Sequence, residues 1–224
     1  MIELTSLHKS YGSHAVLKGV HATFLPGIVY GIIGANGAGK TTLFSCMAGL
    51  TSYEGSVTSS FDDLKNSIGY LPTQPDFMSL ITGWEYLRLV CVARGIETSD
   101  FEAANIFDLP LHQYAENYST GMKKKLALTG ELLRKNETFI LDEPFNGVDL
   151  NSNILMKEII LRLKAANKTV LISSHILATI KELSDEVHLL KDGILHRRLP
   201  DQYQALESEL QQDDVMDRLD RLIL

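Results

Sequence analysis

A glycine-rich loop with one lysine and two threonines stands in the first quarter of the chain. Residues 34–42 read Gly-Ala-Asn-Gly-Ala-Gly-Lys-Thr-Thr, and they follow an apolar run at residues 28–33. Backbone N–H groups can crowd around one anion only where no Cβ blocks its approach, which favours glycine in such a loop. A helix that begins near Lys40 would add the positive end of its dipole. The complete match to G-x-x-x-x-G-K-[ST] from Gly34 to Thr41 predicts a phosphate-binding loop.

The side chains of this loop have separate expected roles. We expect Lys40 to reach the β- and γ-phosphates of a nucleoside triphosphate and Thr41 to offer its hydroxyl to Mg²⁺. The residues expected to contact the nucleotide are Gly34, Asn36, Gly37, Ala38, Gly39, Lys40, Thr41 and Thr42. The structural alternative is an ordinary glycine turn before a helix, which the complete match disfavours. A dinucleotide-binding turn is excluded, because its G-x-G-x-x-G spacing differs and such turns lack the lysine and threonine.

Two acidic residues follow a second apolar run. Residues 138–141 read Thr-Phe-Ile-Leu, and Asp142 and Glu143 come directly after them. A carboxylate at the carboxyl end of a parallel strand, beside a phosphate loop, is placed to hold Mg²⁺ directly or through water. Glu143 is then well placed to orient or deprotonate an attacking water. Without the phosphate loop, the pair could equally be a solvated strand end.

Strands and helices alternate along the chain and must position these residues. Strands are expected at residues 2–7, 16–17, 20–24, 28–33, 54–57, 67–71, 138–141 and 169–172, with a final hairpin at 186–195. Helices are expected at residues 40–50, 84–90, 101–107, 122–134 and 154–166. Short, fully apolar strands are typical of a parallel sheet covered on both faces. The pattern predicts an α/β fold with a mostly helical insertion at residues 75–135.

Composition limits the class of protein. The chain has 224 residues, 45% of them hydrophobic and 22% charged, which suits one large α/β domain or a core with a small subdomain. Its net charge of −7 argues against a nucleic-acid partner, because phosphate backbones are bound by basic surfaces. Cys46 and Cys91 lie in no metal spacing and suggest two buried thiols in a reducing compartment. No run is apolar over the length of a bilayer and the N-terminus has no export pattern, so a cytosolic chain is expected.

The segment at residues 118–122, Tyr-Ser-Thr-Gly-Met, opens the last helix of the insertion. Ser119 is a good helix N-cap, so a purely structural role is available. The segment also resembles the signature motif of ATP-binding cassette ATPases, whose usual form is Leu-Ser-Gly-Gly-Gln. Further features stand in that family's order: Gln74 resembles its Q-loop glutamine, His175 its switch histidine, residues 145–149 its D-loop and Tyr11 the aromatic that stacks on adenine. The resemblance extends from about Ile2 to Leu199.

This resemblance implies a P-loop NTPase fold. A RecA-like core and an antiparallel β-subdomain would occupy residues 1–74 and 136–200, and a helical subdomain residues 75–135. Residues 201–224 would form a C-terminal amphipathic tail, which packs on its own domain or binds a partner.

The resemblance also implies an Mg²⁺-dependent ATPase. Lys40, Glu143 and His175 would be catalytic, Tyr11, Ser119 and Gly121 would join the loop in binding ATP, and Thr41, Gln74 and Asp142 would serve Mg²⁺. The alternatives are a structural histidine for His175, a turn cap for Gln74 and a core or surface position for Tyr11.

The partners implied by the resemblance are a second cassette and a membrane protein. ATP would lie in a head-to-tail dimer, between the phosphate loop of one copy and Ser119–Gly121 of a second copy or a paralogue. The leading function is the ATPase subunit of a transporter with separate transmembrane subunits, peripheral on the cytoplasmic face of the membrane and most like export-type proteins. The alternative is a soluble cassette protein acting on ribosomes or DNA, although such relatives usually carry two cassettes or a long coiled-coil insertion. The third reading is a nucleotide switch that does not hydrolyse, against which Glu143 and His175 argue.

The signature segment departs from the usual form in two places. Thr120 stands where glycine is usual, and Met122 stands where glutamine is usual. If the φ angle at Thr120 must be positive, the threonine is strained by roughly 1–3 kcal/mol. The three lysines at residues 123–125 are most simply a solvated helix face. Because cations at a helix start oppose the dipole, they could instead favour nucleotide or partner binding.

Overall fold

The computed structural model describes residues 1–61, 63–97, 100–203 and 206, and its strands form two sheets. The larger sheet has six strands in the order β5-β6-β7-β3-β8-β9. Its members are β3 (Val29–Ile33), β5 (Ile68–Leu71), β6 (Thr138–Leu141), β7 (Thr169–Ser173), β8 (Glu186–Lys191) and β9 (Ile194–Arg198). Neighbours from β5 to β8 pair in parallel, and β9 is antiparallel to β8. The carboxyl ends of β3, β6 and β7 therefore meet at one edge.

The smaller sheet is antiparallel and comes from the N-terminal part of the chain. Its order is β2-β1-β4, with β1 at Ile2–Tyr11, β2 at His14–Phe24 and β4 at Glu54–Ser59. Alternate residues of β1, such as Ile2 and Leu4, are buried, as expected of a sheet with one covered face. The fold is thus α/β with an N-terminal antiparallel sheet, as the sequence predicts.

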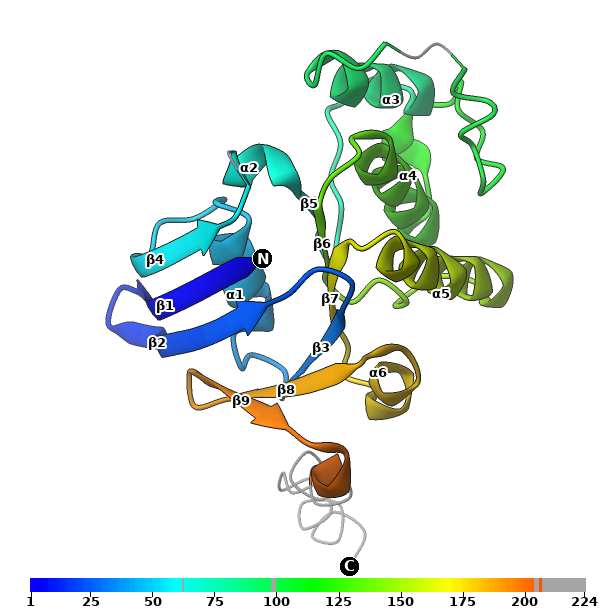
Figure 1. The fold of residues 1–224 in the computed structure, drawn as a ribbon. Coiled ribbons are helices and arrows are strands. Elements are labelled where there is room, and N and C mark those ends of the chain that lie inside the picture. The colour runs from blue at the N-terminus through cyan, green and yellow to red at the C-terminus, as the bar shows by residue number, and fades with distance from the viewer. Residues whose placement is uncertain (62, 98–99, 204–205, 207–224) are drawn as a thin grey trace, which may run out of the picture.

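Helices lie on both faces of the six-stranded sheet. The α-helices of the described residues are α1 (Lys40–Met47), α2 (Leu64–Ser67), α3 (Gly83–Val92), α4 (Thr120–Leu133), α5 (Leu150–Ala165) and α6 (Leu177–Leu183). The antiparallel sheet and α1 lie on one side of the central strands, and α4, α5 and α6 lie on the other (Figure 1). Within the described residues, no helix is both long and apolar enough to cross a lipid bilayer.

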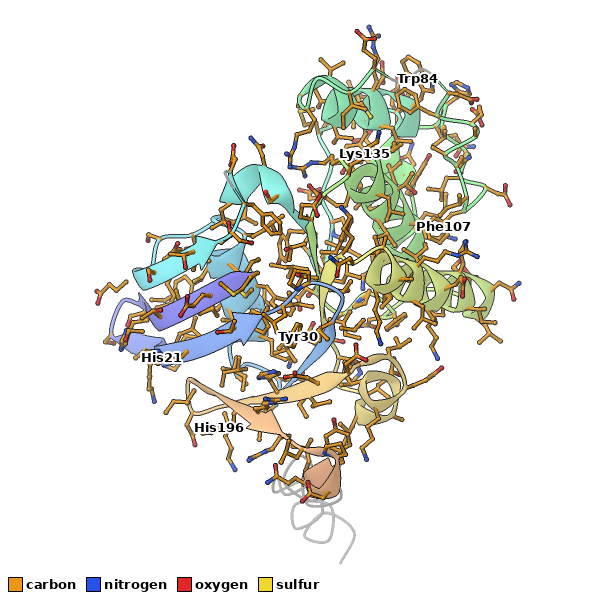
Figure 2. All side chains as sticks on the ribbon, viewed as in Figure 1. His21, Tyr30, Trp84, Phe107, Lys135 and His196 are labelled. Atoms are coloured by element: carbon orange, nitrogen blue, oxygen red, sulfur yellow. The ribbon has the colours of Figure 1, made fainter. Side chains whose placement is uncertain are left out.

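The side chains of β3 alternate between two hydrophobic clusters. Tyr30 and Ile32 belong to the cluster shared with the antiparallel sheet and α1, whereas Val29 and Ile33 belong to the cluster shared with the helices. Figure 2 labels Tyr30 in the layer between the two sheets, where its hydroxyl accepts a hydrogen bond from the Leu25 N–H at 2.7 Å. A strand covered on both faces holds the loop that follows it rigidly.

Both cysteines are free and buried, as the sequence predicts. Burial raises the pKa of the Cys46 thiol to about 11 and also raises the pKa of Cys91. Neither thiol has the thiolate character that reactivity needs.

The helix predicted at residues 101–107 is wrong, because this segment forms turns. Short polar side chains bind the backbone there in place of a helical ladder. Asp100 accepts the Ala103 N–H at 2.9 Å, and the Asn105 amide both accepts from and donates to the backbone of Leu109. Asp108 has a φ of 51°, which no helix tolerates. Phe101 and Phe107 are buried without the helix.

Other elements differ in extent from the prediction. The strands expected at 16–17 and 20–24 are the single strand β2, and α5 begins four residues before the expected start. The helices α2 and α6 were not expected. Apart from residues 201–203 and 206, the predicted tail lies outside the described residues, and Leu206 is buried. The division into subdomains stays a prediction.

Candidate functional site

The glycine-rich loop joins the end of β3 to the start of α1, and its glycines stand where a side chain would be obstructed or strained. A Cβ on Gly34 would lie 2.5 Å from the carbonyl oxygen of Leu190 on the neighbouring strand. Gly37 and Gly39 have φ angles of 81° and 104°, in the region that favours glycine. The loop backbone can therefore approach a ligand closely.

Lys40 curls back over the loop that precedes it. Its Nζ donates to the carbonyl oxygens of Gly34 at 2.8 Å and Ala35 at 3.2 Å, and the residue is only 8% exposed. Burial lowers the pKa of this ammonium, and the nearby carboxylates of Glu143 and Asp142 oppose that shift. The cation thus stands inside the loop, where phosphate oxygens would meet it.

Asp142 lies fully buried at the carboxyl end of β6 and joins two neighbouring elements. Its Oδ2 accepts a hydrogen bond from the Thr41 hydroxyl on α1 at 2.6 Å. Its Oδ1 accepts one from the Ser173 hydroxyl at the end of β7, also at 2.6 Å. A hydroxyl and a carboxylate side by side are the hard oxygen ligands that Mg²⁺ prefers. The described residues contain no cluster of three His, Cys, Asp or Glu side chains, so this pair would hold the ion together with phosphate oxygens.

Glu143 has an unusual backbone conformation, and its N–H and its carboxylate each have a partner. Its φ is 51°, in the left-handed region that costs a non-glycine residue free energy. Its N–H donates to Ser173 Oγ at 2.8 Å, and its Oε2 lies 3.0 Å from Nδ1 of His175. A strained residue held by several contacts at a strand end is typical of a functional position.

One pocket of about 450 Å³ contains most of the predicted nucleotide ligands. It is lined by Tyr11, His14, Val16, Asn36, Gly37, Gly39, Lys40, Thr41, Thr42, Thr73, Asp142 and Glu143. Tyr11 is 53% exposed at the end of β1, and the Lys9 ammonium lies 4.8 Å from its ring centroid. Gln74 is exposed directly after β5, next to the pocket-lining Thr73.

The predicted signature residues lie elsewhere. Ser119 is the N-cap of α4 and accepts a hydrogen bond from the Met122 N–H at 3.3 Å. Within the described part of the chain, neither Ser119 nor Gly121 lines the pocket around the phosphate loop. A Cβ on Gly121 would lie only 2.6 Å from the carbonyl oxygen of Gly147. This turn therefore contacts the segment after β6 within the same chain.

The three lysines that follow are not a solvated helix face, and that expectation is wrong. Lys124 is 1% exposed and donates to the carbonyl oxygens of Glu143 and Asn146. Lys125 pairs with Asp149, the N-cap of α5, at 3.2 Å. Consecutive helical residues point about 100° apart, so the three side chains spread over about 200° of the helix surface, and here Lys124 points into the protein.

This arrangement of loop, carboxylates and histidine on parallel strands agrees with comparison to known proteins. The sequence model of a family described as "ABC transporter" matches residues 17–146, more than half of the chain. The chain belongs to the ABC transporter family.

Relatives in this family are similar over most of the chain. The lantibiotic transport ATP-binding protein SrtF of Streptococcus pyogenes is 31% identical over 207 residues, which cover 86% of this chain and 88% of SrtF. The uncharacterized ABC transporter ATP-binding protein all4389 of Nostoc sp. is 33% identical over 80% of this chain, and the match spans 58% of its own length.

Solved structures of ABC ATPases share the fold. An ATP-binding subunit of an ABC transporter has a TM-score of 0.82 and 27% identity, covering 95% of this chain and all of that one. The ATP-binding cassette MJ0796, in a dimeric post-hydrolysis state bound to ADP and Pi, has a TM-score of 0.77 and 20% identity, covering 88% of this chain and 97% of that chain. At 20% identity, the similarity to MJ0796 shows a shared fold alone.

The departures from the family's signature motif can now be placed. Thr120 is the first residue of α4 and its φ is not positive, so the condition for strain is not met. The sequence did not predict the hydrogen bonds that Ser173 and Lys124 make to the segment carrying Asp142 and Glu143. A polar residue ending an apolar strand beside β6 could have indicated Ser173, and the helical period could have indicated that one lysine points inward.

Proposed function

We propose that the chain binds and hydrolyses ATP as the nucleotide-binding subunit of a membrane transporter. Membership of the ABC transporter family supports the general class. The observation that carries hydrolysis is the convergence of Lys40, Asp142 and Glu143 in one pocket at the edge of a parallel sheet. Phosphoryl transfer to water needs charge stabilisation and an oriented nucleophile, and this set of side chains offers both.

Each residue in the site has a proposed role. Lys40 and the loop amides stabilise the phosphate oxygens, and Tyr11 presents a ring face to adenine. Glu143 accepts a proton from the attacking water, and His175 contacts the γ-phosphate from beside that carboxylate. Thr41, Gln74 and Asp142 would hold Mg²⁺, and the ion would neutralise charge on the phosphates.

We propose that a second copy, or a paralogue, completes the site head to tail. Among the described residues, Ser119 and Gly121 do not line the pocket around the phosphate loop of their own chain. A second hollow of about 300 Å³ lies beside Glu143 and His175, and three exposed apolar side chains line it: Leu150, Ile154 and Ile176. Apolar side chains exposed at a polar site favour contact with another protein. The MJ0796 cassette, similar in fold, is described as a dimer with ADP and Pi.

The proposed partner is a separate transmembrane subunit, with this chain on the cytoplasmic face of the membrane. The direction of transport is proposed as export. The relatives SrtF and BcrA of Enterococcus faecalis, the latter 31% identical over 87% of this chain, are named for lantibiotic transport and bacitracin transport. The acidic net charge disfavours the alternative of a factor that acts on ribosomes or DNA.

Two measurements test the proposal. Purified chain should release phosphate from ATP with Mg²⁺, and Lys40→Ala should bind ATP more weakly; unchanged ATP affinity would remove the phosphate role. A mild-detergent pull-down from membranes of the source cell should recover a polytopic membrane protein. Recovery of ribosomes or DNA in its place would reverse the ranking of functions.

A further inference from the structure

A buried lysine connects α4 to the catalytic edge of the sheet. Lys124 lies in the second turn of α4, and its Nζ donates to the carbonyl oxygen of Glu143 and, at 2.8 Å, to that of Asn146. The helix α4 lies beside α5 in Figure 1, and the segment that receives these hydrogen bonds joins β6 to α5. The ammonium thus reaches from one helix into the backbone of a neighbouring loop.

Burying the Lys124 ammonium costs free energy, and its hydrogen bonds must offset that cost. An ammonium taken out of water is expensive unless carbonyl or carboxylate oxygens replace the lost solvent. Lys124 is buried almost completely, and two main-chain oxygens supply that replacement. An apolar side chain would fill the same space without holding those oxygens.

Lys124 binds the backbone that orients the Glu143 side chain. At a φ of 51° this residue would relax unless its neighbours constrained it. Ser173 receives the N–H of Glu143 on one side, and Lys124 donates to its carbonyl oxygen on the other. The two contacts flank a single Cα, and they come from different elements, β7 and α4.

We propose that Lys124 is a positioning residue for Glu143, holding its carboxylate in line with the attacking water. This inference rests on the proposed ATPase function and adds a residue to it. Because Ser119 caps the same helix one turn earlier, Lys124 also links the turn proposed to contact a partner's nucleotide with the catalytic carboxylate of its own chain. No atom of Lys124 touches nucleotide in this scheme.

The test compares Lys124→Met with Lys123→Met in the full chain. Both changes remove one cation from the same helix, but the Lys123 side chain makes no hydrogen bond or ion pair within the described residues. For Lys124→Met we expect kcat to fall about 10- to 100-fold, because small misplacements of reacting groups cost that much. KM and the affinity for a fluorescent ATP analogue should stay within about twofold. For Lys123→Met all three quantities should stay near wild type.

A second arm separates positioning from general damage. Glu143→Gln already removes the carboxylate, so adding Lys124→Met in that background should change the residual turnover by less than about twofold. A further loss of tenfold would show that Lys124 acts elsewhere and would overturn the inference. Should Lys124→Met fail to fold, Lys124→Gln keeps an N–H donor without the charge, and its kcat should fall while its ATP affinity holds.

The outcomes distinguish this inference from the function on which it rests. If wild type and Lys123→Met hydrolyse ATP and Lys124→Met does so equally fast, the positioning role is wrong and the ATPase stands. A raised KM with unchanged kcat would also overturn it. If the wild-type chain shows no hydrolysis, the proposed function itself fails.

Discussion

The phosphate loop and the start of α4 differ in whether they belong to a pocket of their own chain. The loop lines the proposed nucleotide pocket, and Ser119 and Gly121 are not among the described residues that line it. The loop at residues 34–39 meets Lys40, Thr41 and Asp142 in a single pocket, where the first two residues lie on α1 and Asp142 follows β6. The start of α4 meets the segment after β6 in the same chain, through Gly121, Lys124 and Lys125. The loop is the proposed binding site, whereas the turn at Ser119 is a surface fixed to the segment that carries Glu143.

This difference explains how one chain could both bind and respond to nucleotide. Phosphate binding needs donors that are already arranged, and a strand buried on both faces supplies them. A response needs a contact between elements that can shift together, and α4 meets the segment carrying Glu143 at several points. The comparison predicts that damage to the loop removes binding, and that damage at the start of α4 removes turnover.

The largest expected effect is at the residue that both regions share. Glu143→Gln keeps the shape of the side chain but removes its proton acceptor, and general-base removal typically costs about 10²- to 10⁴-fold. We expect steady-state hydrolysis to fall by that factor while ATP affinity is kept, as measured by phosphate release and nucleotide titration. Normal turnover in this variant would break the assignment of Glu143.

Lys40→Ala tests the loop alone. Loss of a charge-assisted hydrogen bond to phosphate should weaken ATP affinity by about 10- to 100-fold. Thermal unfolding without nucleotide should show that the variant still folds. Within the described residues, the ammonium donates hydrogen bonds to carbonyl oxygens of the loop and to no other group. An affinity equal to that of wild type would mean that the loop does not use its lysine.

Ser173→Ala tests the contact from β7 to both carboxylate residues. The change deletes the donor to Asp142 and the acceptor for the Glu143 N–H, so kcat should fall about tenfold. Ser174→Ala is the matched control, since the Ser174 hydroxyl accepts from Ile176 and has no described hydrogen bond to either acidic residue. Equal kcat values for the two variants would show that the strand contact is dispensable.

Gly121→Ala sharpens the comparison in the absence of nucleotide. A Cβ would approach the Gly147 carbonyl oxygen within its own chain, and overpacking of this kind costs about 1–3 kcal/mol of stability. Denaturant unfolding of the nucleotide-free chain should show this loss. If the free energy of unfolding is unchanged, packing within the chain does not require this glycine. Contact with a partner's nucleotide would then be its remaining proposed role.

Thr120→Gly should have the smallest effect. Because Thr120 is helical, glycine relieves no strain there, and it costs about 0.5–1 kcal/mol in helix propensity at most. We expect hydrolysis within about threefold of wild type. A faster rate would revive the strain argument, and a large loss would show that the threonine side chain is required.

Contiguous patterns in the sequence predicted the loop, the positions of most strands along the chain and the acidic pair, since each depends on a few neighbouring residues. The contacts of Lys124 could not be predicted, because the carbonyl oxygens of Glu143 and Asn146 are brought to α4 only by the fold. The turns at 101–107 were missed because Asn105 and Asp108 compete locally with the helix. Asparagine and aspartate close together were the signal against it.

We expect the pocket around Lys40 to become complete only with a second copy of this chain. The most direct test is the mass of Glu143→Gln in solution, with and without ATP and Mg²⁺, by light scattering after size exclusion. The account predicts one chain of 24.9 kDa without nucleotide and twice that mass with ATP, and a monomer again when Ser119→Arg is added. A chain that binds ATP and stays at 24.9 kDa would contradict the claim.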